Sequence, residues 1–304
     1  MRRALVTGAT GFLGRSALEH VRARGYEVHA AVRRPPVGGH PGVHWHSVDL
    51  LDAAATRRLI AAIAPTDLLH LAWYTEPGIY WESPENERWM RASEALVRAF
   101  AAAGGRRAVV AGTCAEYDWE RTAEPLSERD APLAPRGAYG TAKDRLRREL
   151  ERIAGETGLS AAWARLFFLF GPGEDPRRLV PSVARALLAG DPAPTSRGAQ
   201  VRDYLLSSEA AGALAALLDG EVTGAVNVGS GLGTRVGDLA QMVGTAAGRP
   251  DLLRVGALPE RLDEPPIVVA DTGRLEREVG WRPSGELTGW VEETVDWWRG
   301  RPAG

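Results

Sequence analysis

Two residues four apart, Tyr139 and Lys143 in the stretch AYGTAK, have side chains suited to proton transfer. The surrounding pattern predicts a helix over residues 138–156, and positions i and i+4 share one helical face. A phenol with a pKa of about 10 is a poor acid or base at neutral pH, but a nearby ammonium stabilises the phenolate and lowers that pKa. The pair therefore predicts an acid–base tyrosine with a lysine partner, the alternative being an exposed helical pair.

A threonine ends the apolar run RRAVVAG in the stretch AGTCAEYD. Thr113 is expected at the carboxyl end of a strand, where ligands of open α/β sheets bind. Its hydroxyl there is placed to hydrogen-bond a substrate carbonyl oxygen. The alternative is a threonine that simply finishes the strand.

Three glycines, Gly8, Gly11 and Gly14 in TGATGFLG, lie between an apolar run and a helical pattern. Glycine at a first strand–helix junction lets the backbone approach a pyrophosphate, which the free amides at the helix N-terminus also favour. The spacing is GxxGxxG rather than GxGxxG. It predicts a dinucleotide site, with a tight turn for close packing as the alternative; Lys143 is then placed to reach the nicotinamide ribose.

The end of the second predicted strand bears on the choice of cofactor. An acidic residue about 20 residues past the glycines binds a ribose 2′-hydroxyl, but here Arg33 and Arg34 follow the strand. Two guanidiniums favour a 2′-phosphate and hence NADP (NADPH), with NAD still possible and solvated arginines as the alternative. Asp49, at the end of the third strand, is expected to accept from the adenine amino group or to cap the next helix.

Short apolar runs alternate with amphipathic stretches as far as residue 166, which predicts a doubly wound parallel α/β sheet of the Rossmann type. Beyond Gly171 the loops are rich in Pro and Gly, and helices are expected over 179–188, 208–218, 236–247 and 287–299. We expect a dinucleotide-binding domain over 1–170. Residues 171–304 are expected to form a smaller mixed α/β substrate lobe, partly interleaved with the sheet through a strand at 225–229.

Composition excludes several classes of protein. The chain has 304 residues, a net charge of −2 and a sequence pI near 6.3, so no basic excess points to nucleic acid. One cysteine, Cys114, rules out internal disulfides, and the first strand follows Met1 too closely for a signal peptide, so we expect a cytoplasmic protein without membrane contact. His44 and His46 have no carboxylate or cysteine cluster beside them, so no metal is predicted.

These motifs together resemble the extended short-chain dehydrogenase/reductases, above all their nucleotide-sugar epimerase, dehydratase and reductase group. The resemblance covers most of the chain and is carried by TGATGFLG, AAVRR, VDL, HLA, GTCAEYD, YGTAK, RLFFLFGPGED, VRDYL, AVNVGSG and GWRP. It implies that Thr113, Tyr139 and Lys143 form a catalytic triad. It also implies that Arg202, assisted by Arg178, meets the sugar-nucleotide phosphates.

The resemblance extends to a wider set of positions. The expected cofactor contacts are Gly8, Thr10, Gly11, Phe12, Leu13, Gly14, Arg33, Arg34, Asp49, Leu50, Leu71, Ala72, Tyr139, Lys143 and Pro172, the last bordering the nicotinamide. The expected substrate contacts are Glu76, Cys114, Glu116, Phe168, Arg178 and Arg202. For Glu116 the alternatives are a salt bridge or a surface position, and for Cys114 the alternative is inert packing. The aromatic loop 73–81 is either a sugar-facing wall or a packed loop.

Departures from the family pattern narrow the activity. The 4,6-dehydratases have Asp-Glu directly after the threonine, whereas this chain has Cys114 and Ala115, so dehydration lacks its usual proton shuttle. The asparagine common in the helix after the fourth strand aligns with Trp89, with Asn86 one turn earlier. Acidic residues after the second strand, typical of epimerases that retain NAD, are replaced by the arginine pair.

We therefore expect NADPH-dependent reduction of a nucleotide-linked keto sugar of the 4-keto-6-deoxyhexose type. The alternatives are a nucleotide-sugar epimerase with retained NAD, a reductase of a non-sugar carbonyl, and a non-catalytic NADP-sensing protein. Relatives of the last kind usually lack the Tyr/Lys pair. By analogy with the family, a homodimer is expected through residues 84–103 and 138–156.

Overall fold

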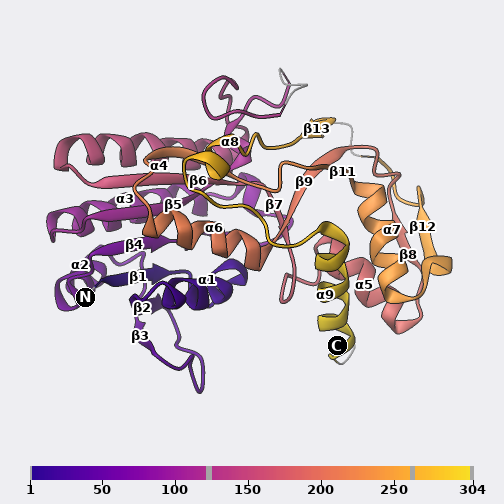
Figure 1. The fold of residues 1–304 in the computed structure, drawn as a ribbon, viewed down its shortest axis with the longest axis horizontal. Coiled ribbons are helices and arrows are strands. Elements are labelled where there is room, and N and C mark those ends of the chain that lie inside the picture. Colours follow the sequence, from indigo (N-terminus) through magenta and orange to yellow (C-terminus); the bar gives the residue numbers. More distant parts are fainter. Residues whose placement is uncertain (1, 121–124, 261–263, 302–304) are drawn as a thin grey trace.

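The computed structural model describes residues 2–120, 125–260 and 264–301, and its largest element is a parallel sheet of seven strands (Figure 1). Its strand order is β10-β6-β5-β4-β1-β2-β3, and every neighbouring pair is parallel. The order reverses between β1 and β4, where open α/β sheets bind ligands. The strands are β1 (Arg3–Thr7), β2 (Glu27–Val32), β3 (Val43–Ser47), β4 (Asp67–His70), β5 (Arg107–Thr113), β6 (Ser160–Leu166) and β10 (Gly224–Val228).

Helices cover both faces of this sheet, which explains why its central strands are apolar on both sides. In β1, Ala4 and Val6 pack with α1 and α6, while Leu5 between them packs on the opposite face with α2 and α3. The two faces therefore follow the alternation of side chains along a strand. The helices are α1 (Phe12–Ala23) and α6 (Ser207–Asp219) on one face, and α2 (Ala53–Ile63), α3 (Glu85–Ala102) and α4 (Gly137–Thr157) on the other.

A second group of elements, drawn at the right of Figure 1, is built from the later part of the chain. In it β9 pairs with β7, β11 and β13, and β12 pairs with β8. Helices α5, α7 and α9 pack on one another beside these strands. The elements are β7 (Phe168–Phe170), α5 (Leu179–Ala189), β8 (Ala193–Thr195), β9 (Val201–Leu206), β11 (Gly233–Arg235), α7 (Val236–Ala247), β12 (Leu253–Val255), β13 (Ile267–Val268) and α9 (Leu287–Arg299). The short helix α8 (Gly273–Arg277) instead contacts β10 of the main sheet.

The α/β fold predicted from the sequence is confirmed, and the long helices begin and end within two residues of their expected bounds. A mixed α/β lobe was expected for the second group, but the positions of its small strands were not predicted. In β9 the reason is visible: Arg202 and Asp203 interrupt the apolar pattern, yet both are buried. Asp203 accepts hydrogen bonds from the amides of Ser230, Gly231 and Ala270, which ties neighbouring loops to the strand.

The chain does not separate cleanly into an early and a late part. Residues 207–228 return to the main sheet, because α6 packs on α1 and β10 pairs with β6. A domain boundary at residue 170 stays a prediction. Within the described residues, no helix combines the length and the apolar character needed to cross a bilayer.

Candidate active site

The glycine turn between β1 and α1 is built by close backbone approaches. Gly8 has a φ of +69°, and a Cβ on it would lie 2.8 Å from the amide nitrogen of Ala72. A Cβ on Gly14 would overlap the carbonyl oxygen of Gly8, to which the amide of Gly11 donates a hydrogen bond of 2.9 Å. Helix α1 begins without a side-chain cap, so its first amides remain available to an anion. The turn fits a pyrophosphate, and the predicted residues Thr10, Phe12 and Leu13 lie on it.

The floor beside this turn depends on residues that the sequence analysis did not identify as functional. The Thr7 hydroxyl accepts from the amides of Leu71 and Ala72, which holds both predicted cofactor residues next to Gly8. Since those amides use its lone pairs, the hydroxyl donates to His70 Nδ1 at 2.7 Å. The other nitrogen of His70 then donates to Ser93 Oγ at 2.8 Å. Burial and the charge of Lys143 lower the pKa of His70 to about 3, so the ring is neutral.

The residues predicted to contact the adenosine half of a dinucleotide follow strands β2 and β3. Arg33 and Arg34 are exposed directly after β2. Asp49 is exposed after β3, and its Oδ1 accepts from the amide of Leu51. The expectation that Asp49 might cap the next helix is wrong, because the cap of α2 is Asp52, whose carboxylate accepts from two first-turn amides. Leu50 is buried behind them.

The three predicted catalytic residues come together where β5 meets α4. Lys143 is only 4% exposed and donates from Nζ to the carbonyl oxygen of Ala111 at 2.8 Å. The Thr113 hydroxyl accepts from the Ala115 amide at 3.2 Å, so its own proton is free to point to the Tyr139 phenol, with which it hydrogen-bonds. An alcohol, a phenol and an ammonium therefore meet beside the carboxyl end of the sheet.

The pKa values of the pair differ from the expectation. Burial raises the pKa of Tyr139, the charge of Tyr80 adds to this, and the hydrogen bond from Thr113 only partly offsets it. Lys143 was expected to lower that pKa, and this is wrong for the structure because burial dominates. Burial also lowers the pKa of Lys143 to about 7, against the opposing effect of Glu116. The phenol is therefore protonated at neutral pH, while the ammonium is poised to lose its proton.

Lys143 is also the only lysine of the chain, since all other members of its 37 Lys and Arg residues are arginines. An arginine is always charged and has a larger planar head, whereas a lysine ammonium is compact and changes its pKa readily when buried. The one lysine of a chain that otherwise uses arginine thus stands at a buried position of the site. This signal was present in the sequence and was not used in its analysis.

The aromatic loop 73–81 packs around Tyr139. The rings of Tyr80 and Trp81 lie 5.0 and 5.6 Å from the Tyr139 ring, both edge to face. Trp73 lies under Lys143, with Nζ 3.8 Å from the ring centroid. The Arg178 guanidinium lies 5.5 Å from the Tyr80 ring, so the loop also meets the segment after β7. These contacts show that the loop is packed against Tyr139 and Lys143. A sugar-facing wall stays a prediction.

The predicted substrate residues fall into two groups. Phe168 and Arg202 lie together, the guanidinium 5.4 Å from the ring centroid. Arg202 is buried, however, and it already donates to the carbonyl of Pro265 at 2.8 Å and to Glu264 at 3.3 Å. Glu76 is exposed and ion-paired with an arginine of the loop after β7. A phosphate contact of Arg202 or Arg178 stays a prediction.

Near these residues, Pro172 precedes a carboxyl group that the sequence analysis missed. Glu174 has one side-chain oxygen buried without a hydrogen-bond partner among the described residues, and burial raises its pKa to about 8. The charge of Arg178 acts in the opposite direction. Cys114 is buried with Tyr117, and burial raises the pKa of its thiol to about 12. The thiol is therefore neutral, as inert packing predicts.

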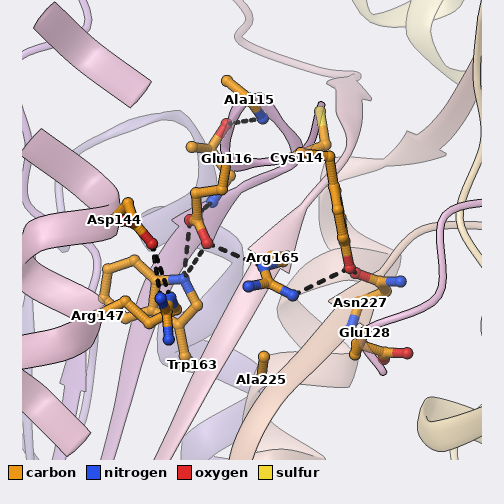
Figure 2. A network of polar contacts seen from close by, with 12 residues as sticks. Cys114, Ala115, Glu116, Glu128, Asp144, Arg147, Trp163, Arg165, Ala225 and Asn227 are labelled. Atoms are coloured by element: carbon orange, nitrogen blue, oxygen red, sulfur yellow. Dashed lines mark hydrogen bonds and ion pairs between the residues drawn. The ribbon is translucent and has the colours of Figure 1, made fainter. Parts of the chain in front are cut away.

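The expectation that Glu116 lines the substrate pocket is wrong. Figure 2 shows its carboxylate turned toward Trp163 and Arg165. The side chain is completely buried, and Arg165 Nε donates to it at 2.9 Å, so both oxygens are already engaged. The salt bridge, weighed as the alternative, is what the structure contains. Spacing alone placed the residue beside Thr113 but gave no direction for its side chain.

Several known proteins are similar to this chain. The model of the NAD dependent epimerase/dehydratase family matches residues 4–229. A UDP-glucose 4-epimerase of Streptomyces lividans is 28% identical over 99% of this chain and 97% of its own length. A 3-diazoavenalumate denitrifying reductase of a Streptomyces species is 32% identical over 74% of this chain and 75% of its own. The solved UDP-glucose 4-epimerase of Thermus thermophilus, in complex with NAD, is 27% identical with a TM-score of 0.87, covering 98% of this chain and 99% of that one.

Proposed function

Since the chain belongs to the NAD-dependent epimerase/dehydratase family, we propose that it reduces the keto group of a nucleotide-linked sugar of the 4-keto-6-deoxyhexose type with NADPH. The observation that carries this proposal is the meeting of Thr113, Tyr139 and Lys143 beside the glycine turn. The connection to the turn runs through adjacent residues: Ala72 lies against Gly8, and Trp73 lies under the Lys143 ammonium.

The chemistry that the dinucleotide supplies when bound is hydride transfer to the carbonyl carbon. Tyr139 gives its phenolic proton to the oxygen that becomes an alkoxide, and its raised pKa keeps that proton in place until then. The Thr113 hydroxyl turns its single proton from the Tyr139 phenol to the same oxygen when the substrate is bound. Lys143 uses one N–H on Ala111 and offers the others to the ribose hydroxyls. A protonated phenol is the state that reduction requires, which supports the reductase over an oxidation that starts from phenolate.

Two further features support this choice of reaction and cofactor. The positions after Thr113 hold Cys114 and Ala115, both buried, and neither supplies the acid–base pair of a dehydratase. Arg33 and Arg34 are exposed where a 2′-phosphate of NADP lies against the end of the second strand.

The arginine pair can be tested by itself. Replacing both Arg33 and Arg34 by alanine is expected to weaken NADPH binding at least about tenfold and to leave NADH binding nearly unchanged, because only NADPH carries the 2′-phosphate. Arg91→Ala, in an exposed arginine of α3, is the control and is expected to bind both cofactors as the wild type does. Equal losses of affinity for NADPH and NADH would contradict a contact between these arginines and the 2′-phosphate.

The test of the function is spectroscopic. The protein is mixed with NADPH and a panel of UDP-, dTDP-, CDP- and GDP-linked keto sugars, and oxidation of the cofactor is followed. Turnover with at least one sugar is expected, and Tyr139→Phe is expected to lower kcat roughly 100-fold or more while NADPH still binds. If the variant oxidised NADPH at the wild-type rate, the role of Tyr139 as the proton donor would be contradicted.

An epimerase is the second candidate. The S. lividans relative and the Thermus thermophilus structure are both named UDP-glucose 4-epimerase, and they match 99% and 98% of this chain. An epimerase differs from the proposed reductase because it retains its cofactor between turnovers. Nucleotide released from the purified, denatured protein is identified by mass: tightly held NAD⁺ together with no net use of NADPH supports the epimerase.

A reductase of a non-sugar compound is favoured by a different observation. The relative with 32% identity is named for reduction of 3-diazoavenalumate, and Tyr80 and Trp81 give this site aromatic walls. Binding of the four nucleoside diphosphates by calorimetry separates the cases, because a non-sugar reductase ignores all of them.

We propose also that α3 and α4 pair with their counterparts in a second copy of the chain. Within one chain the two helices pack side by side, and the ion pairs Arg145–Glu87 and Arg98–Glu149 join them at the surface. The surface that a second copy would cover is therefore polar. Sedimentation velocity is expected to show a dimer that weakens as salt is raised. A monomer at all protein concentrations would refute the pairing.

A further inference from the structure

Glu116 is a carboxylate in the short helix Cys114–Glu116 at the carboxyl end of β5, with 0% of its surface exposed. Three donors surround it. The Thr113 amide donates at 2.9 Å. The Trp163 indole at 2.8 Å and the Arg165 guanidinium at 2.9 Å can be followed in Figure 2. Gly112 makes room for this arrangement, because a Cβ there would overlap the Trp163 indole nitrogen. Strands β5 and β6 therefore cooperate to hold one negative charge.

Burying the ion pair of Glu116 and Arg165 in the core has a high desolvation penalty. Two charges taken out of water lose hydration that their attraction barely restores, and apolar residues of similar volume often stabilise as well or better. Stability alone therefore does not explain Glu116 and Arg165. What distinguishes the carboxylate is the group that it holds on its other side, the backbone of Thr113.

Two of the last three residues of β5, Ala111 and Thr113, are tied to the candidate active site. The carbonyl of Ala111 accepts from Lys143, and the amide of Thr113 donates to Glu116. The Thr113 hydroxyl in turn accepts from the Ala115 amide, which completes a capping box around the short helix Cys114–Glu116. The direction of the Thr113 hydroxyl is thus set by a turn that the Glu116 carboxylate closes.

The charge of Glu116 also acts on the lysine. Burial lowers the pKa of Lys143, and Glu116 is the group that opposes this. The carboxylate therefore favours the charged form of an ammonium that low polarity would otherwise neutralise. The same charge adds to the raised pKa of Tyr139, which keeps the phenol protonated.

The far end of the network reaches the later part of the chain. Arg165 donates to the Tyr117 hydroxyl at 3.1 Å, and that hydroxyl donates to Asn227 on β10 at 2.8 Å. Asn227 then donates to the carbonyls of Leu126 and Asp271. The guanidinium is thereby tied to neighbouring segments, so the carboxylate that it holds has little freedom to move.

We propose that Glu116, held by Arg165, is a positioning residue that orients the Thr113 hydroxyl beside Lys143 in the candidate active site. The kinetic consequence of this inference rests on the proposed function. The effect of the carboxylate charge on Lys143 concerns the protein alone, without substrate or cofactor.

The single lysine makes a direct test possible. Protein grown with ¹³C-labelled lysine gives one lysine side-chain signal, and its shift against pH reports the pKa of Lys143. Glu116→Gln keeps the shape of the side chain and removes its charge, so the midpoint is expected to fall by about half a pH unit or more. Trp163→Phe removes one donor to the carboxylate without changing charge, and its midpoint is expected to match the wild type.

Kinetics test the second part in any assay that shows turnover. Glu116→Gln is expected to lower kcat about 10- to 100-fold with little change in KM, since a misplaced Thr113 affects the reacting oxygen rather than binding. Glu116→Asp, which keeps the charge, is expected to restore the Lys143 midpoint although not the full kcat. An inactive wild type would overturn the proposed function and leave the titration result standing.

Two outcomes overturn the inference. A folded Glu116→Gln variant with the wild-type midpoint and the wild-type kcat shows that the carboxylate does neither task. If that variant does not fold, the double change Glu116→Gln/Arg165→Met removes the unpaired guanidinium and is titrated instead. If the double variant also fails to fold, or folds with an unchanged midpoint, the network serves folding alone.

Discussion

At the scale of single residues, Lys143 is the side chain on which the candidate site depends most. Its ammonium is held by one carbonyl and one indole ring, and it is the only lysine that the chain contains. Tyr139 owes its place to the helical spacing, and Thr113 owes its place to the end of β5. The buried ammonium has a cost in stability that can be measured.

Lys143→Met is expected to stabilise the protein most near neutral pH. The folded pKa of Lys143 is about 7 and the unfolded pKa is about 10.4, so the unfolded chain binds more protons between these values. Stability contributed through this group therefore rises as pH increases from about 7 to about 10. Urea unfolding at several pH values is expected to show an advantage of the variant that shrinks by a few kcal/mol over this window.

Arg145→Met, an exposed change on the same helix, is the control for this experiment. Its difference from the wild type is expected to vary little with pH, because the ion pair with Glu87 is at the surface. A Lys143→Met advantage that stays constant from pH 7 to pH 10 contradicts a lowered pKa of the buried ammonium.

At the scale of elements, the turn into α1 is the part with least tolerance for change. Gly14→Ala places a methyl group on the Gly8 carbonyl and is expected to cost roughly 1–3 kcal/mol. It is also expected to weaken NADPH binding at least about tenfold, because the turn that approaches the pyrophosphate is forced open. Thermal unfolding and a fluorescence titration measure the two effects.

Gly155→Ala is the matched control. Gly155 lies inside α4 with no atom within 4 Å of an added Cβ, so alanine is expected to stabilise the helix by roughly 0.5–1 kcal/mol. NADPH binding is expected to stay as in the wild type. If the two alanine variants have the same stability and the same NADPH affinity, the close approach at Gly14 does not explain why this position is glycine.

The edge of the sheet at β2 and β3 is expected to be sensitive to acid. His29 Nδ1 lies 3.0 Å from His46 Nε2, and burial lowers the pKa of both rings, an effect that Glu27 opposes for His29. His44 adds to the lowering in both cases. Because the folded pKa values lie below the unfolded value of about 6.5, stability is present above that pH and is lost as pH falls below it.

His46→Gln is expected to reduce this acid sensitivity. Unfolding free energies in urea at pH 7.5 and pH 5.5, both chosen to bracket the ordinary histidine pKa of about 6.5, are expected to differ less for the variant than for the wild type. His40→Gln, in the loop before β3, is the control and is expected to keep the wild-type difference. If all three proteins lose the same unfolding free energy between the two pH values, the stacked histidines are not the cause of the acid sensitivity.

At the scale of the whole molecule, the two predicted parts of the chain are expected to unfold together. Helix α6 has Ala210, Leu214 and Leu217 fully buried, and β10 pairs with the edge of β6. A fragment of residues 1–170 lacks both elements, so it exposes the apolar surface of α1 and an unpaired strand edge. It is expected to aggregate, whereas the full chain is expected to show one unfolding transition by circular dichroism.

Much of this molecule could be predicted from the local pattern. Strands buried on both faces read as short apolar runs, and helices packed on one face read as amphipathic stretches, so the alternation that defines the sheet is visible in the sequence. The positions of Thr113, Tyr139 and Lys143 followed from the same reading, because carboxyl ends of parallel strands share one edge. These features depend on neighbours in sequence, which is why they were accessible.

The tertiary structure decided what depends on distant partners. Glu116 became a structural carboxylate because Arg165, 49 residues later, points at it, and the pKa of Tyr139 rose because residues of the loop 73–81 bury it. The strand β9 exists because its buried Arg202 and Asp203 find partners in segments far along the chain. A sequence records which side chains are present and how they alternate, whereas their direction, burial and charge state are set by contacts that only the folded chain brings together.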